Sequence, residues 1–283
     1  MTEPDKQPAK EPAKEPGGRV RRMGRLTEPS AEGLLTYGDY LAVPELISLQ
    51  RLRSDPAVHD ELLFIVVHQA YELWFKQLIF ELESVRDRLI DADPARARHY
   101  LARIHAIERV LIDHIQVLET MSPQDFLEFR SLLTPASGFQ SAQFREVEFL
   151  SGLKEPRYLN DLAASSDELA RLALRLDEPT VWDGFVSLLE RHGLDMPEHD
   201  EEQRRDSLLR MAREPQHAAL FGVAEGLLDH DESFAQWRFH HVLMVEREIG
   251  AKRGTGGSSG VEYLRSTLDK RFFPELWGLR SHL

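Results

Sequence analysis

The sequence predicts an all-α protein, built as a bundle of long helices. Apolar residues recur at alternating spacings of three and four over long stretches, which is the period of one face of a helix. Ser, Asp and Pro residues divide these stretches where helices usually begin and end. No convincing run alternates apolar and polar residues as a half-buried strand would. The pattern therefore favours helices packed on helices.

Composition narrows the class of protein further. The 283 residues are 42% hydrophobic, which is enough for a large buried core, and contain no cysteine. Disulfides, thiolate zinc sites, iron–sulfur clusters and covalently attached haem are thus excluded. The net charge of −13 argues against nucleic acid as a partner, and no apolar run reaches the length of about 18 residues that a membrane span needs. A cytoplasmic location is expected, because the first residues lack the apolar core of a secretory signal.

Residues 1–30 form a Pro/Lys/Glu-rich tail with the short repeat PAKEPAKEP. Few apolar residues are available there to offset the entropy of ordering, so we expect this tail to be disordered. A mitochondrial transit peptide is an alternative, disfavoured by four acidic residues within positions 1–26. Order is expected to begin near LTYGDYL, and residues 31–283 are expected to form a single domain.

Three helices are predicted after this point. Ser54, Asp55 and Pro56 suggest a cap and a first-turn proline for the first of them. Asp93-Pro94 starts the second, and Ser122 caps a short third one that Thr134-Pro135 ends. The residues expected on the buried faces of the first two are Phe64, His68, Tyr71, Phe75, Leu78, Leu82, Leu101, Ile104, Ile107, Leu111, Ile115 and Leu118.

The segment FQSAQFREVEFLSGL looks helical again, and several more helices follow between about residues 158 and 228. They are expected to break at Pro179, Pro197 and Pro215, and to form an auxiliary section with little recognisable chemistry. A separate helix is predicted over residues 231–250. A glycine-rich loop and a short helical ending complete the chain.

The stretch QWRFHHVLMVEREIGAKRGTGGSSG, residues 236–260, carries the strongest candidate for a ligand site. At about 100° per residue, His241 shares an apolar stripe with Phe234, Trp237 and Val245, whereas His240 lies on a mostly polar side. A neutral imidazole in an apolar wall is what a haem iron needs as its axial ligand. A satisfied core histidine remains the alternative for His241.

The glycines around Thr255 would let the backbone approach a bound molecule closely. The same composition, GTGGSSG, is also typical of a flexible linker. It is not a phosphate-binding loop, because the GKS or GKT ending is missing.

Two further pairs suit a small planar ligand. Phe64 and His68 are four residues apart, so both can line one pocket. Phe126 and Arg130 are likewise four apart and offer an aromatic wall beside a guanidinium fork that fits a carboxylate. Each pair alone could instead be structural or exposed.

Other chemistries lack their motifs. A di-iron bundle needs two Glu-x-x-His motifs, and the single match, residues 214–217, is interrupted by Pro215. HExxH and the dinucleotide-binding fingerprint are missing from the sequence. A haem-binding or other ligand-binding helical fold remains.

Four motifs in order resemble the tryptophan 2,3-dioxygenase family: LTYGDYL, FIVVHQAYELWFKQ, DFLEFR with SGFQSAQFR, and FHHVLMVEREIGAKRGTGGSSGVEYLRST. The resemblance spans about Leu35 to Thr267 and is weakest between Tyr158 and Leu228. It implies a bundle of long helices enclosing a pocket for haem b. It further implies a homotetramer, a dimer of dimers, that converts L-tryptophan and O2 to N-formyl-L-kynurenine, the first step of tryptophan catabolism by the kynurenine pathway.

The resemblance also implies roles for individual residues. His241 is similar to the haem iron ligand, and His68 to the histidine that meets the indole N–H. Arg130 is similar to the residue that binds the substrate carboxylate, and Thr255 to the loop residue near its ammonium group. The remaining residues that resemble substrate-binding positions are Phe64, Ile65, Val66, Val67 and Phe126, with Tyr37 and Tyr40 contributed by a neighbouring subunit.

Two positions depart from the family pattern. Phe126 stands where some bacterial members carry Tyr, so a hydroxyl contact to the carboxylate is expected to be missing. Glu246 stands where other members have His, on the polar side of its helix, and this change is expected to be harmless. A haem-binding sensor without turnover and an all-α interaction protein without a cofactor remain open alternatives.

Overall fold

The computed structural model describes residues 34–283, which fall into two units, 34–51 and 52–283. The first unit contains two short helices, α1 (Tyr37–Tyr40) and α2 (Val43–Leu46). Thr36 caps α1 by accepting a hydrogen bond from the backbone N–H of Asp39. The tail predicted over residues 1–30 lies outside the described residues.

Every element of regular secondary structure in the second unit is a helix, and residues 34–283 contain no strand, as the predicted all-α class requires. Its elements are α3 (His59–Ile90), α4 (Pro94–Leu118), α5 (Pro123–Arg130), η1 (Ser131–Leu133), η2 (Gly138–Gln140), α6 (Ala142–Ser151), α7 (Tyr158–Asp161), α8 (Ser166–Asp177), α9 (Val181–Arg191), α10 (Glu201–Arg213), η3 (Pro215–His217), α11 (Ala218–Ile249), α12 (Val261–Arg265) and α13 (Pro274–Leu279). Within residues 34–283, no helix combines the length and the apolar character needed to cross a bilayer.

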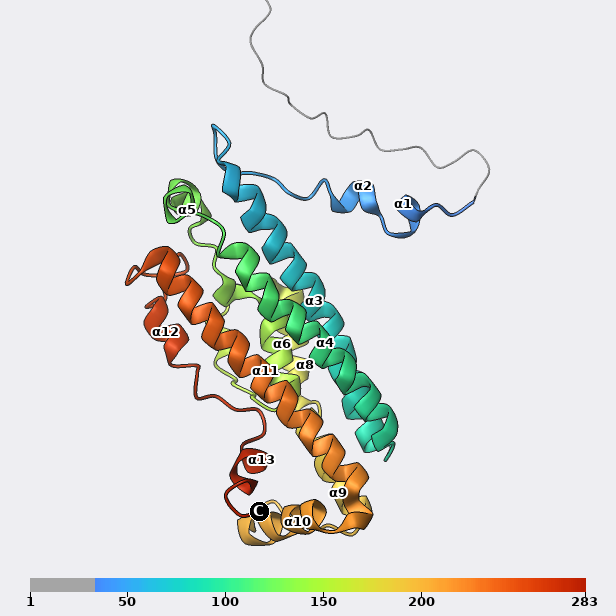
Figure 1. Ribbon diagram of the computed structural model, residues 1–283. Coiled ribbons are helices and arrows are strands. Elements are labelled where there is room, and N and C mark those ends of the chain that lie inside the picture. Colours follow the sequence, from blue (N-terminus) through green and yellow to red (C-terminus); the bar gives the residue numbers. More distant parts are fainter. Residues whose placement is uncertain (1–33) are drawn as a thin grey trace, which may run out of the picture. The chain divides into compact units, whose positions relative to one another are not determined.

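Three long helices form the frame of this unit (Figure 1). α3 and α4 pack along each other and α11 packs along α4, while α6 and α9 pack against α3. The apolar stripes predicted for α3 and α4 supply much of the core: Leu78, Leu82 and Ile104 are fully buried. Burying a side chain of this size stabilises the fold by about 1.5–3 kcal/mol.

α4 begins where its sequence predicts. The Asp93 carboxylate accepts a hydrogen bond from the backbone N–H of Arg96 at 3.1 Å, and Pro94 occupies the first turn. Ser122 caps α5 in the same way, through the backbone N–H of Asp125. The predicted start of α3 is wrong. Ser54 donates instead to Glu61 and accepts from the backbone N–H of Val58, so the helix begins later, at His59.

Two other boundaries differ from the prediction. The segment expected to be one helix after Tyr158 is split into α7 and α8. Ser165 and Glu168 form a capping box there, a Ser-x-x-Glu signal visible in the sequence.

The predicted break near residues 228–231 is wrong as well, since α11 runs unbroken through Asp229–Glu232. These polar residues look like a break but are held by tertiary partners. His230 Nδ1 lies 2.5 Å from a carboxylate oxygen of Glu108, and Asp231 accepts the backbone N–H groups of Phe272 and Phe273.

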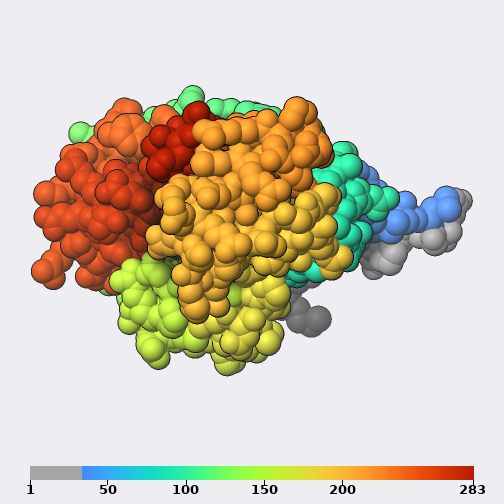
Figure 2. All heavy atoms as spheres, turned by 90° about the horizontal axis from the view of Figure 1, so that it is seen from below, coloured from blue at the N-terminus to red at the C-terminus, as the bar shows by residue number. Residues whose placement is uncertain are grey.

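The section between residues 158 and 228 shares the main core. Phe185 and Leu188 of α9 are fully buried in the same hydrophobic cluster as α3 and α4. A smaller cluster joins Phe149 of α6 to Tyr158 and Leu172. Seen end-on, the gold and orange atoms of this section and of the start of α11 cover one end of the unit, with the dark red C-terminal segment beside them (Figure 2).

Candidate functional site

α11 presents its two adjacent histidines to different surroundings. The ring of His241 stacks on that of Trp237, with centroids 5.0 Å apart and planes inclined by 7°. Phe234, one turn before Trp237 on this face, is buried, while His240 and Arg247 are exposed. The helical phase expected from the sequence therefore agrees with the structure.

His241 is held as a neutral imidazole. Burial lowers its pKa to about 4, and the positive charge that the nearby His68 carries when protonated contributes to the same shift. Its side chain nevertheless keeps some accessible surface. Within residues 34–283 neither ring nitrogen has a protein hydrogen-bond partner, so a nitrogen lone pair is available to a ligand.

His68 projects from α3, and its Nδ1–H donates to the Phe64 carbonyl oxygen at 2.7 Å. A carbonyl can only accept, so the proton lies on Nδ1 of the neutral ring and Nε2 carries a lone pair. Burial lowers the pKa of His68, which keeps the ring neutral at ordinary pH. His68 therefore offers an acceptor that suits a donor such as an indole N–H.

Phe64 and Phe126 form an aromatic wall beside His68. Their rings stack with centroids 5.6 Å apart and planes inclined by 26°, and the rings of Phe64 and His68 are 4.0 Å apart. Phe129, which is fully buried, supports both phenylalanines edge-on at 5.7 and 5.4 Å. This wall suits a planar apolar ligand.

The glycine-rich loop closes on the segment that follows α5. Arg130 donates to the backbone carbonyl of Arg253, and the Thr255 hydroxyl donates to the Ala136 carbonyl at 2.6 Å. A Cβ on Gly256 would lie 2.6 Å from Cβ of Ser137, so only glycine permits this approach. The fold thus brings Arg130 and Thr255, which lie 125 residues apart in sequence, to neighbouring segments.

The three consecutive residues 65–67 of α3, which were expected to line the pocket, do not all point in the same direction. Val67 is buried in the core, whereas Val66 is 46% exposed, because successive helical side chains point about 100° apart. Ile65 lies between these extremes. In the first unit, Tyr37 and Tyr40 are exposed by 77% and 73%.

The two departures from the family pattern have simple surroundings. Phe126 supplies stacking and no hydroxyl. Glu246 is exposed on α11 and accepts two hydrogen bonds from Arg265, both at 2.9 Å, so its charge is paired at the surface. Neither residue disturbs the inward face of α11.

The donor set fits a haem. An iron porphyrin needs one neutral nitrogen ligand from the protein on one side, apolar surroundings, and no further protein ligand. His241, stacked on Trp237 and unprotonated, meets the first two conditions. The sequence spacing predicts that Trp237 shares the inward face of the helix with His241. The face-to-face stacking of the two rings is seen only in the structure.

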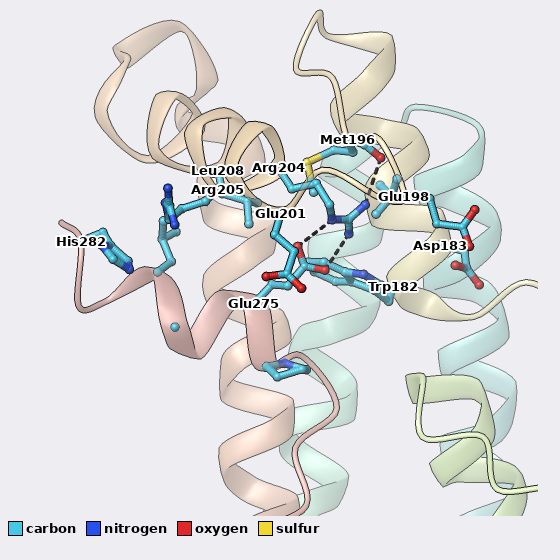
Figure 3. Close-up of a pocket in the computed structure, with 14 residues that line it drawn as sticks. Trp182, Asp183, Met196, Glu198, Glu201, Arg204, Arg205, Leu208, Glu275 and His282 are labelled. Carbon is cyan, nitrogen blue, oxygen red and sulfur yellow. Dashed lines mark hydrogen bonds and ion pairs between the residues drawn. The ribbon is translucent and has the colours of Figure 1, made fainter.

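A large cavity lies elsewhere, between α9, α10 and α13, with a volume of about 760 Å³ (Figure 3). Arg204 spans it, donating twice to Glu275 at 2.9 and 2.6 Å and once to the Met196 carbonyl at 3.0 Å. None of the predicted site residues lines this cavity. This bidentate ion pair joins α10 to α13. The charged residues of the cavity therefore have a structural role in holding these two helices together.

Comparisons with known proteins agree with the motifs. The family profile described as tryptophan 2,3-dioxygenase matches residues 25–201 and 206–283. A tryptophan 2,3-dioxygenase from Nocardioides sp. is 53% identical over 256 residues, covering 88% of this chain and 95% of the relative. Relatives of the same name from Herpetosiphon aurantiacus and Anaeromyxobacter dehalogenans are 45% and 44% identical, covering 88% and 91% of this chain and 98% and 100% of the relatives. The chain therefore belongs to the tryptophan 2,3-dioxygenase family.

Proposed function

We propose that this protein is a haem-dependent dioxygenase that cleaves the C2–C3 bond of the indole of L-tryptophan with O2. Both oxygen atoms enter the product, N-formyl-L-kynurenine. Family membership supports the reaction. The observations that carry the assignment to these residues are the stack of His241 of α11 on Trp237 and the bond that fixes the tautomer of His68 of α3, with the two rings within electrostatic range of each other.

His241 would hold the iron of the cofactor, which we propose to be haem b. The bound haem supplies the redox chemistry with O2. The stack on Trp237 limits rotation of the imidazole, so the ring is oriented before the cofactor arrives. Because the pKa of His241 is about 4, no proton has to leave the ring at neutral pH.

His68 would orient the substrate. Its Nδ1–H is committed to the Phe64 carbonyl, so Nε2 is the free acceptor for the indole N–H. An unsubstituted indole N–H is a very weak acid, and a ring whose pKa is lowered is a poor base for it. Orientation rather than proton abstraction is therefore the role proposed for His68.

The rest of the pocket would divide into an apolar slot and two polar contacts. Phe64 and Phe126 stack beside the indole and exclude water. Arg130 offers its guanidinium to the carboxylate, and Thr255 offers its hydroxyl near the ammonium group. A mostly apolar site with few oriented polar groups is typical of small-ligand pockets.

We also propose that residues 31–283 act as one domain in a cytoplasmic homotetramer, with Tyr37 and Tyr40 completing the pocket of a neighbouring subunit. Large apolar side chains exposed in residues 34–51 support this association, among them Leu35, Leu41 and Ile47. So does an exposed apolar stripe along α3 formed by Leu62, Val66, Leu73 and Phe80. Exposed apolar surface of this extent usually marks an interface.

One assay tests the proposal. The purified protein should show a Soret band, and under reducing conditions with O2 it should convert L-tryptophan to a product with the absorbance of formylkynurenine. A protein without a Soret band would contradict the haem assignment. A coloured protein that leaves tryptophan unchanged would instead be a haem-binding sensor or carrier.

A further inference from the structure

The glycine-rich loop of residues 250–260 continues directly into α12, and Tyr263 of that helix fixes the end of the loop. The Tyr263 hydroxyl lies 3.4 Å from Nη2 of Arg145 and 3.3 Å from the hydroxyl of Tyr158. Its ring meets Phe139 edge-on at 5.4 Å. The C-terminal end of the loop is therefore anchored on α6 and on the segments beside it.

Arg145 is buried, with 4% of its surface exposed. Its guanidinium lies 4.1 Å from the ring centroid of Tyr158 and 5.0 Å from that of Phe144, and its Nη1 donates to Glu148 at 2.6 Å. An arginine held by stacking and by a carboxylate has little freedom to move. It offers the Tyr263 hydroxyl a fixed partner.

The same carboxylate connects to α11. The second oxygen of Glu148 accepts from Nη2 of Arg238 at 3.0 Å, and Nη1 of Arg238 donates to the Lys270 carbonyl at 3.2 Å. Arg238 is also buried and lies three residues before His241, about one helical turn away. Contacts thus run without a gap from Tyr263 through Arg145 and Glu148 to the helix that carries His241.

This chain of charges is costly to bury. Two guanidinium groups share a single carboxylate, and the Nε atoms of Arg145 and Arg238 are buried without hydrogen-bond partners. An apolar replacement of similar volume would often be at least as stable. Stability alone therefore does not account for the arrangement, whereas fixed geometry between two functional segments does.

We propose that Tyr263 and Arg145 are positioning residues, which hold the loop that carries Thr255 in a fixed position relative to the helix that carries His241. This inference rests on the proposed function of Thr255 and His241. The loop itself contains five glycines and has few side chains with which to fix its course. Its middle is held by Thr255 on Ala136, and its end by Tyr263 on Arg145.

Tyr263→Phe tests the anchor, because it removes the hydroxyl and keeps the ring. Lys252 and Arg253 are exposed trypsin sites within the loop, so their cleavage in the haem-loaded protein reports detachment without any need for turnover. Cleavage after these residues, identified by mass spectrometry, should be about threefold to tenfold faster, the change expected when one hydrogen bond is lost from an opening equilibrium. Tyr100→Phe makes the same chemical change on α4 and should leave this rate unchanged.

Kinetics separate positioning from a general structural role. Tyr263→Phe should raise KM for tryptophan by about threefold to tenfold while kcat, haem content and melting temperature stay close to the parent values. Arg145→Met should have a larger effect on both cleavage and KM, and Arg145→Lys should recover part of it. Should Arg145→Met fail to fold, Tyr263→Phe alone decides the question.

The proposal is overturned if Tyr263→Phe and Arg145→Lys match the parent in loop cleavage and in KM. It is also overturned if they lower haem content or melting temperature with no change in loop cleavage, because the network would then only stabilise α11. If the parent protein does not oxidise tryptophan, the proposed function fails, and the cleavage rates still decide whether Tyr263 anchors the loop.

Discussion

His68 of α3 and His241 of α11 lie close enough that a proton on the first would help to lower the pKa of the second. The two residues are 173 positions apart in sequence, and packing of α3 and α11 on α4 brings them together. Both rings are neutral, one with a free Nε2 and the other stacked on Trp237. Such a pair suits a substrate acceptor and an iron ligand placed in one site, and the predictions below follow from it.

His241→Ala should give folded protein that is colourless or weakly loaded with haem, because the alanine side chain has no atom that can ligate iron. His241→Gly with added imidazole should recover the Soret band. His240→Ala is the matched control: His240 is exposed, so its loss should change the free energy of unfolding by no more than about 0.5 kcal/mol and leave the colour. Loss of haem from the His240 variant alone would reverse the assignment.

The stability of the haem-free protein should fall as the pH drops from about 6.5 to about 4. The pKa of His241 is lowered from 6.5 to about 4 by burial and by His68, so in this range the unfolded chain binds a proton that the folded chain does not. At pH values below about 4 this shift lowers the free energy of unfolding by up to about 3 kcal/mol. Well above pH 6.5, the pKa of the unfolded chain, it has no effect. Urea unfolding of the parent, His241→Phe and His240→Phe across this range measures it. Burial also lowers the pKa of His68, so part of the slope should remain in every variant, and a slope as steep in His241→Phe as in the parent would contradict the prediction.

His68→Ala should retain haem and measurable activity if the residue only orients the indole. An obligatory general base would cost about 10²–10⁴-fold in rate. 1-Methyltryptophan has no N–H, so the alanine variant should use it at least as well as the parent does, because steric crowding is relieved. Turnover measured with both substrates decides between the roles, and complete loss of activity on tryptophan would exclude orientation.

Arg130→Leu should impair tryptophan binding more than haem binding. A charge-assisted contact to a carboxylate is worth about 1.5–3 kcal/mol, so affinity should fall by about tenfold to more than a hundredfold. The variant also loses the bond from Arg130 to the Arg253 carbonyl. Tryptamine, which has no carboxylate, controls for this: it should bind the parent poorly and lose little more in the variant. Equal tryptophan affinity in parent and variant would exclude Arg130 as the anchor.

Deletion of residues 1–26 should leave folding, haem content and activity nearly unchanged, since that segment has few apolar residues with which to pack. Deletion of residues 1–41 also removes Tyr37 and Tyr40, and should lower substrate affinity and weaken the oligomer. Tryptophan titration and sedimentation of both truncations measure these effects. Identical behaviour of the two proteins would argue against a pocket shared between subunits.

The sequence by itself determined the helical class, the caps at Asp93 and Ser122, and the inward phase of His241. Each depends on periodicity or on contacts within a few residues, which a single chain segment contains. The four motifs also sufficed to indicate the family, because their order and spacing are specific.

Only the tertiary structure decided the rest. Asp229–Glu232 looks like a helix break until Glu108 and the backbone of Phe272 and Phe273 supply partners for His230 and Asp231. The tautomer of His68, the stack of Trp237 on His241, and the path from Tyr263 to Arg238 likewise depend on distances between atoms. Those distances are set by how helices far apart in sequence pack, and no local pattern of residues records them.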